Sequence, residues 1–321
     1  MKLLFLRGQV PTDRDPRQII FDNLSDCDDM WTQLASKIGD EYSEIWYWGG
    51  TRKVRYRKNF VERWVPNFAT YKSEFKPDVI FARGGFKQYD CILDRYPQAY
   101  KIYYGAGRRF FPTSRFTKFN LILNDTPNQV KITKSKFPLS RVELLIKPAA
   151  DNIFRHKQCS KEYDVIMVAN EQPKKDIKGH RFASLHIPSQ YKFIKVGIPL
   201  KTTIKEHPHI KFTGWVKRSE VSDYYNKSKV AIVCCDKVDS APRVISESLA
   251  CGCPVLALSG VHFWQDMYIN EKTGMICNEN NFVEKLKFMV DNYEQFEPHT
   301  YYKDNLSLDV AANRIKSIIK G

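Results

Sequence analysis

Short apolar runs alternate along the chain with longer stretches in which apolar residues recur every three or four positions. The runs Lys2–Leu6, Asp78–Ala82 and Val230–Cys234 are almost continuously apolar, which is typical of parallel strands covered on both faces. The stretches Met30–Ile38 and Arg243–Cys251 have helical spacing instead. This alternation predicts an α/β fold with doubly wound parallel sheets.

The same patterns predict the remaining elements. Further strands are expected at Glu44–Trp48, Tyr100–Tyr104, Asn120–Leu123, Val142–Ile146, Asp164–Ala169, Phe193–Val196, Ile210–Phe212 and Val255–Leu258. Further helices are expected at Tyr89–Arg95, Ser219–Asn226, Phe282–Tyr293 and Leu308–Lys320. A length of 321 residues suits two domains of about 150 residues each.

We therefore expect two Rossmann-like domains with a cleft between them. Their predicted bounds are 1–154 and 155–300, with the polar stretch Arg155–Lys161 as the linker. Residues 301–321 form a C-terminal helix that is expected to cross back to the first domain.

Composition excludes several classes of protein. Hydrophobic residues make up 43% of the chain, which is too many for a disordered protein. No run approaches the roughly 18 apolar residues of a membrane-spanning helix, and the apolar stretch near Met1 is too short for a secretory signal. The eight cysteines form neither a disulfide framework nor a zinc motif. These features predict a cytoplasmic protein.

Positive charge is concentrated in the first half of the chain. The 51 basic and 36 acidic residues leave a net charge of +15. Residues 1–150 hold 26 basic and 16 acidic side chains, a surplus of 10, whereas residues 151–321 hold 25 and 20, a surplus of 5. If the protein meets a polyanion, we expect the first half to meet it.

The strongest chemical motif is Asp239–Ala257, which reads DSAPRVISESLACGCPVLA. A loop leads from a predicted strand into a helix, and Gly252 followed by Pro254 is a typical helix end. Asp239 precedes the helix and Glu247 lies about one turn into it. Backbone N–H groups at a helix start, beside two carboxylates, suit a ligand with phosphates between hydroxyl-bearing rings.

This motif resembles the signature of the retaining nucleotide-sugar glycosyltransferases of family 4, which have the two-Rossmann GT-B architecture. The resemblance implies that Asp239 holds the transferred sugar and that Glu247 binds the ribose diol. It implies contacts to the sugar and the diphosphate from Ala241, Pro242, Arg243 and Val244. The first acid is Asp rather than Glu, and Ser-Ala-Pro replaces the usual glycine-rich turn. We interpret these departures as a sign of an unusual sugar, smaller than a hexose.

Two other segments extend the resemblance to residues 142–290. In DVIMVANEQPKKDIKG, Lys178 and Gly179 match the family's diphosphate-binding basic residue and its glycine. The family's Arg is not matched, and Lys174 or Lys175 is the substitute, unless these lysines are only a solvated surface. The segment Leu145–Phe154 resembles the family's crossing between domains, and Trp215 falls in its base-binding region.

The first half resembles the family in topology only. Gly8, in the loop after the first strand, would allow a phosphate to approach the backbone. The family's histidine in this domain is absent, because no histidine precedes His156. Arg83, Arg108 and Arg109 stand beside glycine-rich turns, where they either line the acceptor side of the cleft or lie on the surface.

A basic and aromatic stretch, WYWGGTRKVRYRKNFVERW, suggests the acceptor. Cations neutralise phosphates, and aromatic rings stack on exposed bases. The expected contacts are Arg52, Lys53, Arg55, Arg57 and Lys58, with Arg63, Tyr56, Phe60 and Trp64 in the same stretch. Charge and architecture together resemble the phage enzymes that glycosylate 5-hydroxymethylcytosine in DNA. The alternatives are docking on an anionic membrane and a basic loop with core aromatics.

The sequence thus predicts a retaining glycosyltransferase that moves a hexose or pentose from a UDP-sugar to a 5-hydroxymethylated pyrimidine in DNA. Asp239, Lys178 and Glu247 are its expected catalytic residues. The nucleotide sugar is a substrate, and no metal or bound cofactor is expected, because Asp13-Arg14-Asp15 reads as a polar loop. The alternatives are a transferase for surface polysaccharide or lipid-linked glycan, and a non-catalytic nucleotide- or DNA-binding protein. Nothing in the sequence indicates an oligomeric state.

Overall fold

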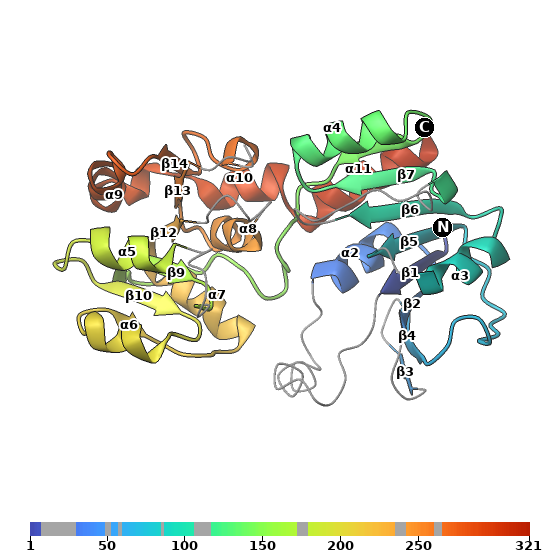
Figure 1. Ribbon diagram of the computed structural model, residues 1–321, viewed down its shortest axis with the longest axis horizontal. Coiled ribbons are helices and arrows are strands. Elements are labelled where there is room, and N and C mark those ends of the chain that lie inside the picture. Colours follow the sequence, from blue (N-terminus) through green and yellow to red (C-terminus); the bar gives the residue numbers. More distant parts are fainter. Residues whose placement is uncertain are drawn as a thin grey trace. The chain divides into compact units, whose positions relative to one another are not determined.

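The chain divides into two compact units. The computed structural model describes residues 1–7, 30–48, 53–56, 60–84, 87–105, 117–171, 179–234, 242–259 and 265–321. Unit one comprises Met1–Leu145 and Ala311–Gly321, and unit two comprises Ile146–Val310 (Figure 1). Residues 155–161, with their linker-like composition, lie inside unit two.

Unit one is built on a sheet of eight strands in the order β3-β4-β2-β1-β5-β6-β7-β8. Neighbouring strands run parallel except β3 and β4, which are antiparallel at the edge. The strands are β1 (Leu3–Arg7), β2 (Ser43–Trp48), β3 (Lys53–Tyr56), β4 (Phe60–Val65), β5 (Val79–Arg83), β6 (Tyr100–Gly105), β7 (Leu121–Asn124) and β8 (Arg141–Leu144).

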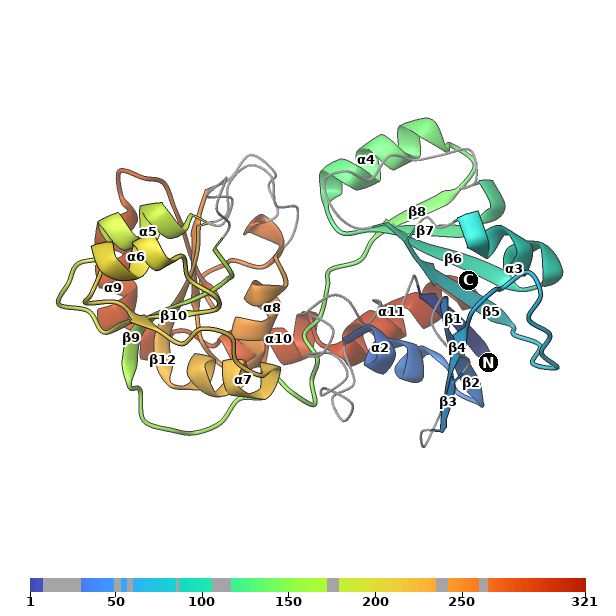
Figure 2. The same ribbon diagram turned by 60° about the horizontal axis from the view of Figure 1, so that its bottom comes forward.

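Helices cover both faces of this sheet. They are α2 (Met30–Ile38), α3 (Asp90–Arg95) with the short η1 (Lys87–Tyr89), α4 (Pro127–Lys136) and α11 (Leu308–Lys320). Figure 2 shows α3 and α4 on one side of the sheet and α2 and α11 on the other. Side chains alternate between the two faces of each strand, which explains this arrangement. Leu4 and Ile80 share a core with residues of α3, whereas Phe5 stacks on Phe81 and the Phe81 ring lies tilted against Trp31 of α2.

Unit two contains a six-stranded parallel sheet in the order β11-β10-β9-β12-β13-β14. The strands are β9 (Tyr163–Val168), β10 (Phe193–Val196), β11 (Lys211–Phe212), β12 (Ser228–Val233), β13 (Val255–Leu258) and β14 (Gly274–Cys277). After β9, the strands β10 and β11 are added on one side of it, and β12 then pairs with β9 on its other side. The order therefore reverses between β9 and β12, and such a switch point is where doubly wound sheets bind ligands.

The helices of unit two lie on both sides of its sheet. They are α5 (His180–His186), α6 (Lys201–Glu206), α7 (Arg218–Asn226), α8 (Arg243–Ala250), α9 (Phe282–Asp291) and α10 (Pro298–Asn305), with the short η3 (Gln265–Met267) and η4 (Tyr293–Gln295). Figure 2 shows α5 and α9 on one side and α7 and α8 on the other. Ala183 of α5 and Phe282 of α9 share one apolar core with Val165 and Val230 of the sheet.

The predicted class, α/β with two parallel sheets, is confirmed. The main difference concerns the basic stretch after Trp48, for which the sequence pattern predicts no strand and which contains β3 and most of β4. Trp64 stacks on Tyr47 with ring centroids 4.9 Å apart, and Phe60 is buried. Both aromatic rings therefore take part in packing the sheet. Charged residues interrupt the apolar pattern of β4, which hid the strand.

The predicted end of helix α8 is also confirmed. Gly252 has a φ of +75° directly after α8, as expected of a left-handed helix cap. Cys234, Cys251, Cys253 and Cys277 are buried free thiols, and burial raises the pKa of Cys251 to about 12. No helix in the described ranges is long and apolar enough to cross a bilayer.

Candidate functional site

At the switch point of unit two, Gly179 lies against Cys234, directly after the end of β12. This glycine precedes α5 with a φ of +70°, a conformation that favours glycine. A Cβ atom at this position would collide with the carbonyl oxygen of Cys234, the residue that follows β12. The chain that returns from β9 therefore meets the end of β12 at backbone distance, which only glycine permits.

Two predicted donor-binding segments begin at this edge of the sheet. The first runs between Glu171 and Gly179, and the second between Cys234 and Pro242. The predicted residues inside these segments, and most of those in the first half, lie outside the described residues. They are Asp239, Ala241, Lys174, Lys175 and Lys178, together with Gly8, Arg52, Arg57, Lys58, Arg108 and Arg109.

Two hydrogen bonds hold the first turn of helix α8, which follows the second segment in the chain. Buried Pro242 precedes the helix, and Arg243 is its first residue. The Ser246 hydroxyl donates to the carbonyl of Lys147 at 2.6 Å, and the Tyr225 hydroxyl donates to the carbonyl of Val244 at 3.2 Å. The start of α8 is thus fixed by neighbours on two sides.

Glu247 lies one turn into α8 and is only 8% exposed. Its Oε1 accepts a hydrogen bond of 2.8 Å from Nη2 of Arg218, the first residue of α7. The same guanidinium lies over the ring of Phe154 at 5.3 Å. Arg218 therefore keeps a nearly buried carboxylate in one orientation. Arg218 is not among the residues that the sequence motifs single out, although it follows Trp215 by three positions.

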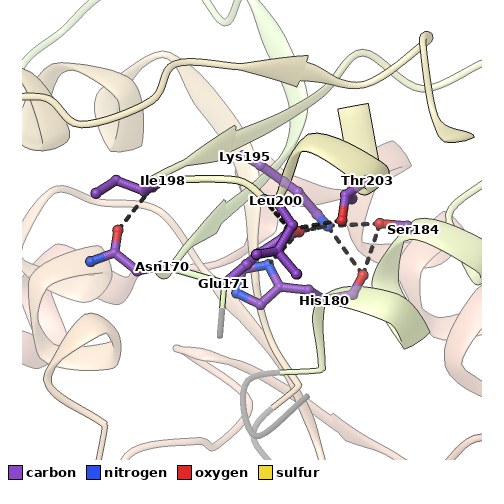
Figure 3. Close-up of polar contacts among 8 residues, drawn as sticks. All are labelled: Asn170, Glu171, His180, Ser184, Lys195, Ile198, Leu200 and Thr203. Atoms are coloured by element: carbon purple, nitrogen blue, oxygen red, sulfur yellow. Dashed lines mark hydrogen bonds and ion pairs between the residues drawn. The ribbon is translucent and has the colours of Figure 1, made fainter. Parts of the chain in front are cut away.

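A second buried cluster lies at the carboxyl ends of β9 and β10 (Figure 3). Lys195 of β10 is 3.3 Å from Oε1 of Glu171, and both side chains are less than 5% exposed. Its ammonium also donates to the carbonyl of His180 at 3.1 Å and to the Ser184 hydroxyl at 2.7 Å. These contacts join the end of β9 to the first turn of α5.

Glu171 also fixes the start of α6. Its Oε2 accepts hydrogen bonds from the amide of Leu200 at 2.7 Å and from the Thr203 hydroxyl at 2.8 Å. Burial alone would raise the pKa of Glu171, but these two hydrogen bonds and the charges of Lys195 and His180 outweigh it and lower the pKa. The carboxylate is thus ionised at neutral pH. The sequence signal for this cluster is Lys195, a charged residue within the apolar run FIKV.

The described candidates in unit one are fewer. Arg83, at the end of β5, lies over the ring of Trp31 at 4.9 Å. It is the register partner of Arg7 at the end of β1, a residue that the sequence analysis did not select. Lys53 and Arg55 belong to the edge strand β3. Arg63 is instead bound to Glu44 through two hydrogen bonds of 2.7 and 2.9 Å, so it supports the sheet.

The geometry of unit two agrees with a comparison against known families. Residues 150–305 match the family described as "Glycosyl transferases group 1". The matched region covers almost all of unit two, including the switch point, Arg218 and Glu247. Unit two thus carries a group 1 glycosyltransferase domain, and the protein is a glycosyltransferase. No curated protein matches the sequence.

Solved structures agree with the fold over the whole chain. A glycosyltransferase from Rickettsia africae aligns with a TM-score of 0.68 at 13% identity, over 99% of this chain and 97% of its own. Sucrose-phosphate synthase from Thermosynechococcus elongatus gives 0.67 at 11% identity, over 99% and 98%. HepE from Anabaena, in complex with UDP and glucose, gives 0.65 at 12% identity, over 100% and 99%. The chain is similar to these proteins in its GT-B fold.

Proposed function

We propose that the protein transfers a sugar from a UDP-sugar with retention of the anomeric configuration. The observation that carries this proposal is the Glu247 carboxylate, which Arg218 holds one turn into α8. A fixed carboxylate at that place is suited to accept hydrogen bonds from the two ribose hydroxyls. The fold neighbours HepE and the pneumococcal O-GlcNAc transferase GtfA, both described in complex with UDP, support the choice of nucleotide.

The proposed reaction breaks the bond between the anomeric carbon and the diphosphate oxygen. The acceptor oxygen forms the new bond on the same face, and its proton passes to the departing diphosphate, so that UDP leaves. Lys178 and the amides at the start of α8 would stabilise the charge on that diphosphate. Asp239 would hold the transferred sugar. Each of these roles is a proposal from the sequence motif.

Replacing the carboxylate tests the nucleotide site directly. Glu247→Gln should weaken UDP binding at least 10-fold in calorimetry and should weaken 2′-deoxy-UDP binding less, because one ribose hydroxyl is already missing. Glu284→Gln, at an exposed position of α9, is the matched control and should bind UDP normally. Equal UDP affinity in the Glu247 variant and the wild type would contradict the assignment.

For the acceptor, we propose a 5-hydroxymethylated pyrimidine in DNA. The support is the surplus of 10 positive charges in residues 1–150 and the basic edge strand β3, which also presents Tyr56 with 77% of its surface exposed. Since Arg63, Trp64 and Phe60 are engaged within the sheet, the proposal now depends on β3 and on the remaining arginines and lysines of unit one.

One surface of unit one favours a second acceptor class. Leu139, after α4, is fully exposed, and Ile132 of α4 is 41% exposed. Lys131, Lys134 and Lys136 are exposed on the same short segment. Apolar side chains among lysines suit an anionic bilayer, where a lipid-linked acceptor would lie.

One set of assays separates the two acceptors. With a radiolabelled donor sugar, DNA as the acceptor predicts transfer to hydroxymethylated duplex DNA, no transfer to the unmodified duplex, and a steep loss of DNA binding with added salt. Transfer only to extracted lipid carriers, with binding to phosphatidylglycerol vesicles that is lost in Leu139→Ser, would overturn the DNA proposal in favour of the bilayer.

A further inference from the structure

The ion pair between Glu171 and Lys195 connects the residues on either side of segment 172–178. Glu171 is the last described residue before this segment, and His180 follows Gly179 directly after it. Lys195 contacts the Glu171 carboxylate and the His180 carbonyl with the same ammonium group (Figure 3). One buried side chain from the neighbouring strand thus connects the two ends of the segment that carries Lys174, Lys175 and Lys178.

Backbone contacts complete the frame around Glu171. Its amide donates to the carbonyl of Ile198 at 3.0 Å, and Asn170 Oδ1 accepts from the amide of Ile198 at 2.9 Å. The Leu200 amide and the Thr203 hydroxyl bind the other carboxylate oxygen. The starts of α5 and α6 and the end of β9 are therefore held together by polar contacts.

Stability alone explains this arrangement poorly. Removing two charges from water costs about as much as their attraction returns, so well-packed apolar side chains would stabilise the same place equally or better. Polar contacts, however, hold atoms in one geometry, because each hydrogen bond has a defined length and direction. The pair is also located at the carboxyl edge beside the switch point, where doubly wound sheets bind their ligands.

We propose that Lys195 and Glu171 are positioning residues of the donor site, which hold Gly179 and the end of β9 in place for the donor diphosphate. This inference rests on the proposed function. Neither residue touches the nucleotide in this scheme, and both act through the ends of segment 172–178. The effect is therefore confined to ligands that carry a diphosphate.

The experiment compares UDP with uridine in calorimetry, since uridine uses the base and ribose contacts but lacks the diphosphate. We expect Lys195→Met to weaken UDP binding at least 10-fold and to leave uridine binding unchanged. Lys192→Met, an exposed lysine three positions earlier, is the control and should bind both ligands like the wild type. With donor sugar, Lys195→Met should raise KM more than it lowers kcat.

The double variant Glu171→Gln with Lys195→Met separates positioning from stability. A Gln side chain still offers an oxygen to Leu200 and Thr203, and Met fills the space of the lysine without a charge. We expect most of the thermal stability lost in Lys195→Met to return while UDP affinity stays low. This variant also serves if Lys195→Met alone does not fold.

The outcomes are distinguishable. If the double variant binds UDP as tightly as the wild type does, the pair is merely structural and the inference is wrong. If UDP and uridine affinities fall together, a general distortion of the site is the cause, which also contradicts the inference. If the wild type itself shows no preference for UDP over uridine, the proposed function fails first, and the inference fails with it.

Discussion

Each unit of the molecule contains a buried carboxylate bound to a cation, and the two pairs lie at opposite ends of their sheets. In unit one, Glu44 stands near the amino end of β2 and receives two hydrogen bonds from Arg63 of β4. In unit two, Glu171 follows the carboxyl end of β9 and faces Lys195 of β10. Glu44 and Glu171 are both less than 5% exposed.

The partners of the two carboxylates differ in kind. Glu44 also accepts hydrogen bonds from the Trp46 indole at 2.5 Å and from the Tyr42 hydroxyl at 2.9 Å. Trp46 belongs to β2, Tyr42 directly precedes β2, and Arg63 belongs to β4. The bonds of Glu44 therefore join one strand to the next. Glu171 instead contacts the first residue of α5, His180, and the start of α6, and its partner Lys195 donates to the His180 carbonyl. The same chemistry thus serves the sheet in unit one and, as proposed, the ligand in unit two.

The largest effect is expected at the switch point. Gly179→Ala forces an L side chain into a left-handed conformation and against the Cys234 carbonyl, and should lower the free energy of unfolding by about 3 kcal/mol and weaken UDP binding. Gly214→Ala is the matched control, because φ is +69° there but an added Cβ would have no other atom within 4 Å, and the substitution should cost only about 1 kcal/mol. Equal losses in urea unfolding would show that the close approach is unimportant.

The pair in unit one should affect stability alone. Arg63→Met leaves the Glu44 carboxylate buried without its cation, and should lower the free energy of unfolding by about 3 kcal/mol. Thermal unfolding and UDP calorimetry of the folded variant are the measurements. A 10-fold loss of UDP affinity would erase the distinction between the two pairs.

A moderate effect is expected from Arg218, which orients the carboxylate of Glu247, the proposed ribose-binding residue. Arg218→Met keeps an apolar contact with Phe154 but removes the hydrogen bond to Glu247, and should weaken UDP binding about 10-fold, or about 1.4 kcal/mol. The preference for UDP over 2′-deoxy-UDP should shrink as well. An unchanged preference in calorimetry would mean that Glu247 is oriented without Arg218.

The smallest effect is a dependence on pH. Because the pKa of Glu171 lies below its ordinary value of 4.5 in the folded protein, its ionised form stabilises the fold above that value. This contribution is lost as the pH falls through the lowered folded pKa. The stability difference between wild type and Glu171→Gln should therefore be constant near neutral pH and shrink below about pH 4 in urea unfolding. A difference that grows in acid would contradict the sign of the shift.

The parts of the molecule that were predictable from sequence are those set by local patterns. Strands such as Phe193–Val196 and helices such as Met30–Ile38 have the predicted bounds, because apolar periodicity reflects burial directly. Strand β4 was missed because Glu62 and Arg63 break its pattern, and their partners lie on another strand. Lys195, Glu171 and Arg218 were missed for a related reason, since each gains its role from a residue distant in sequence.

The final helix has a consequence for how the protein is made. Helix α11 begins in unit two, yet Ala311–Gly321 belong to unit one, where Arg141 donates to the Ile318 carbonyl and Ile315 is fully buried. During synthesis, Met1–Leu145 leave the ribosome long before Ala311–Gly321, the segment that packs with them. Unit two, although later in sequence, is a continuous stretch that can fold as soon as it emerges. The segment that completes unit one is therefore translated only after the whole of unit two.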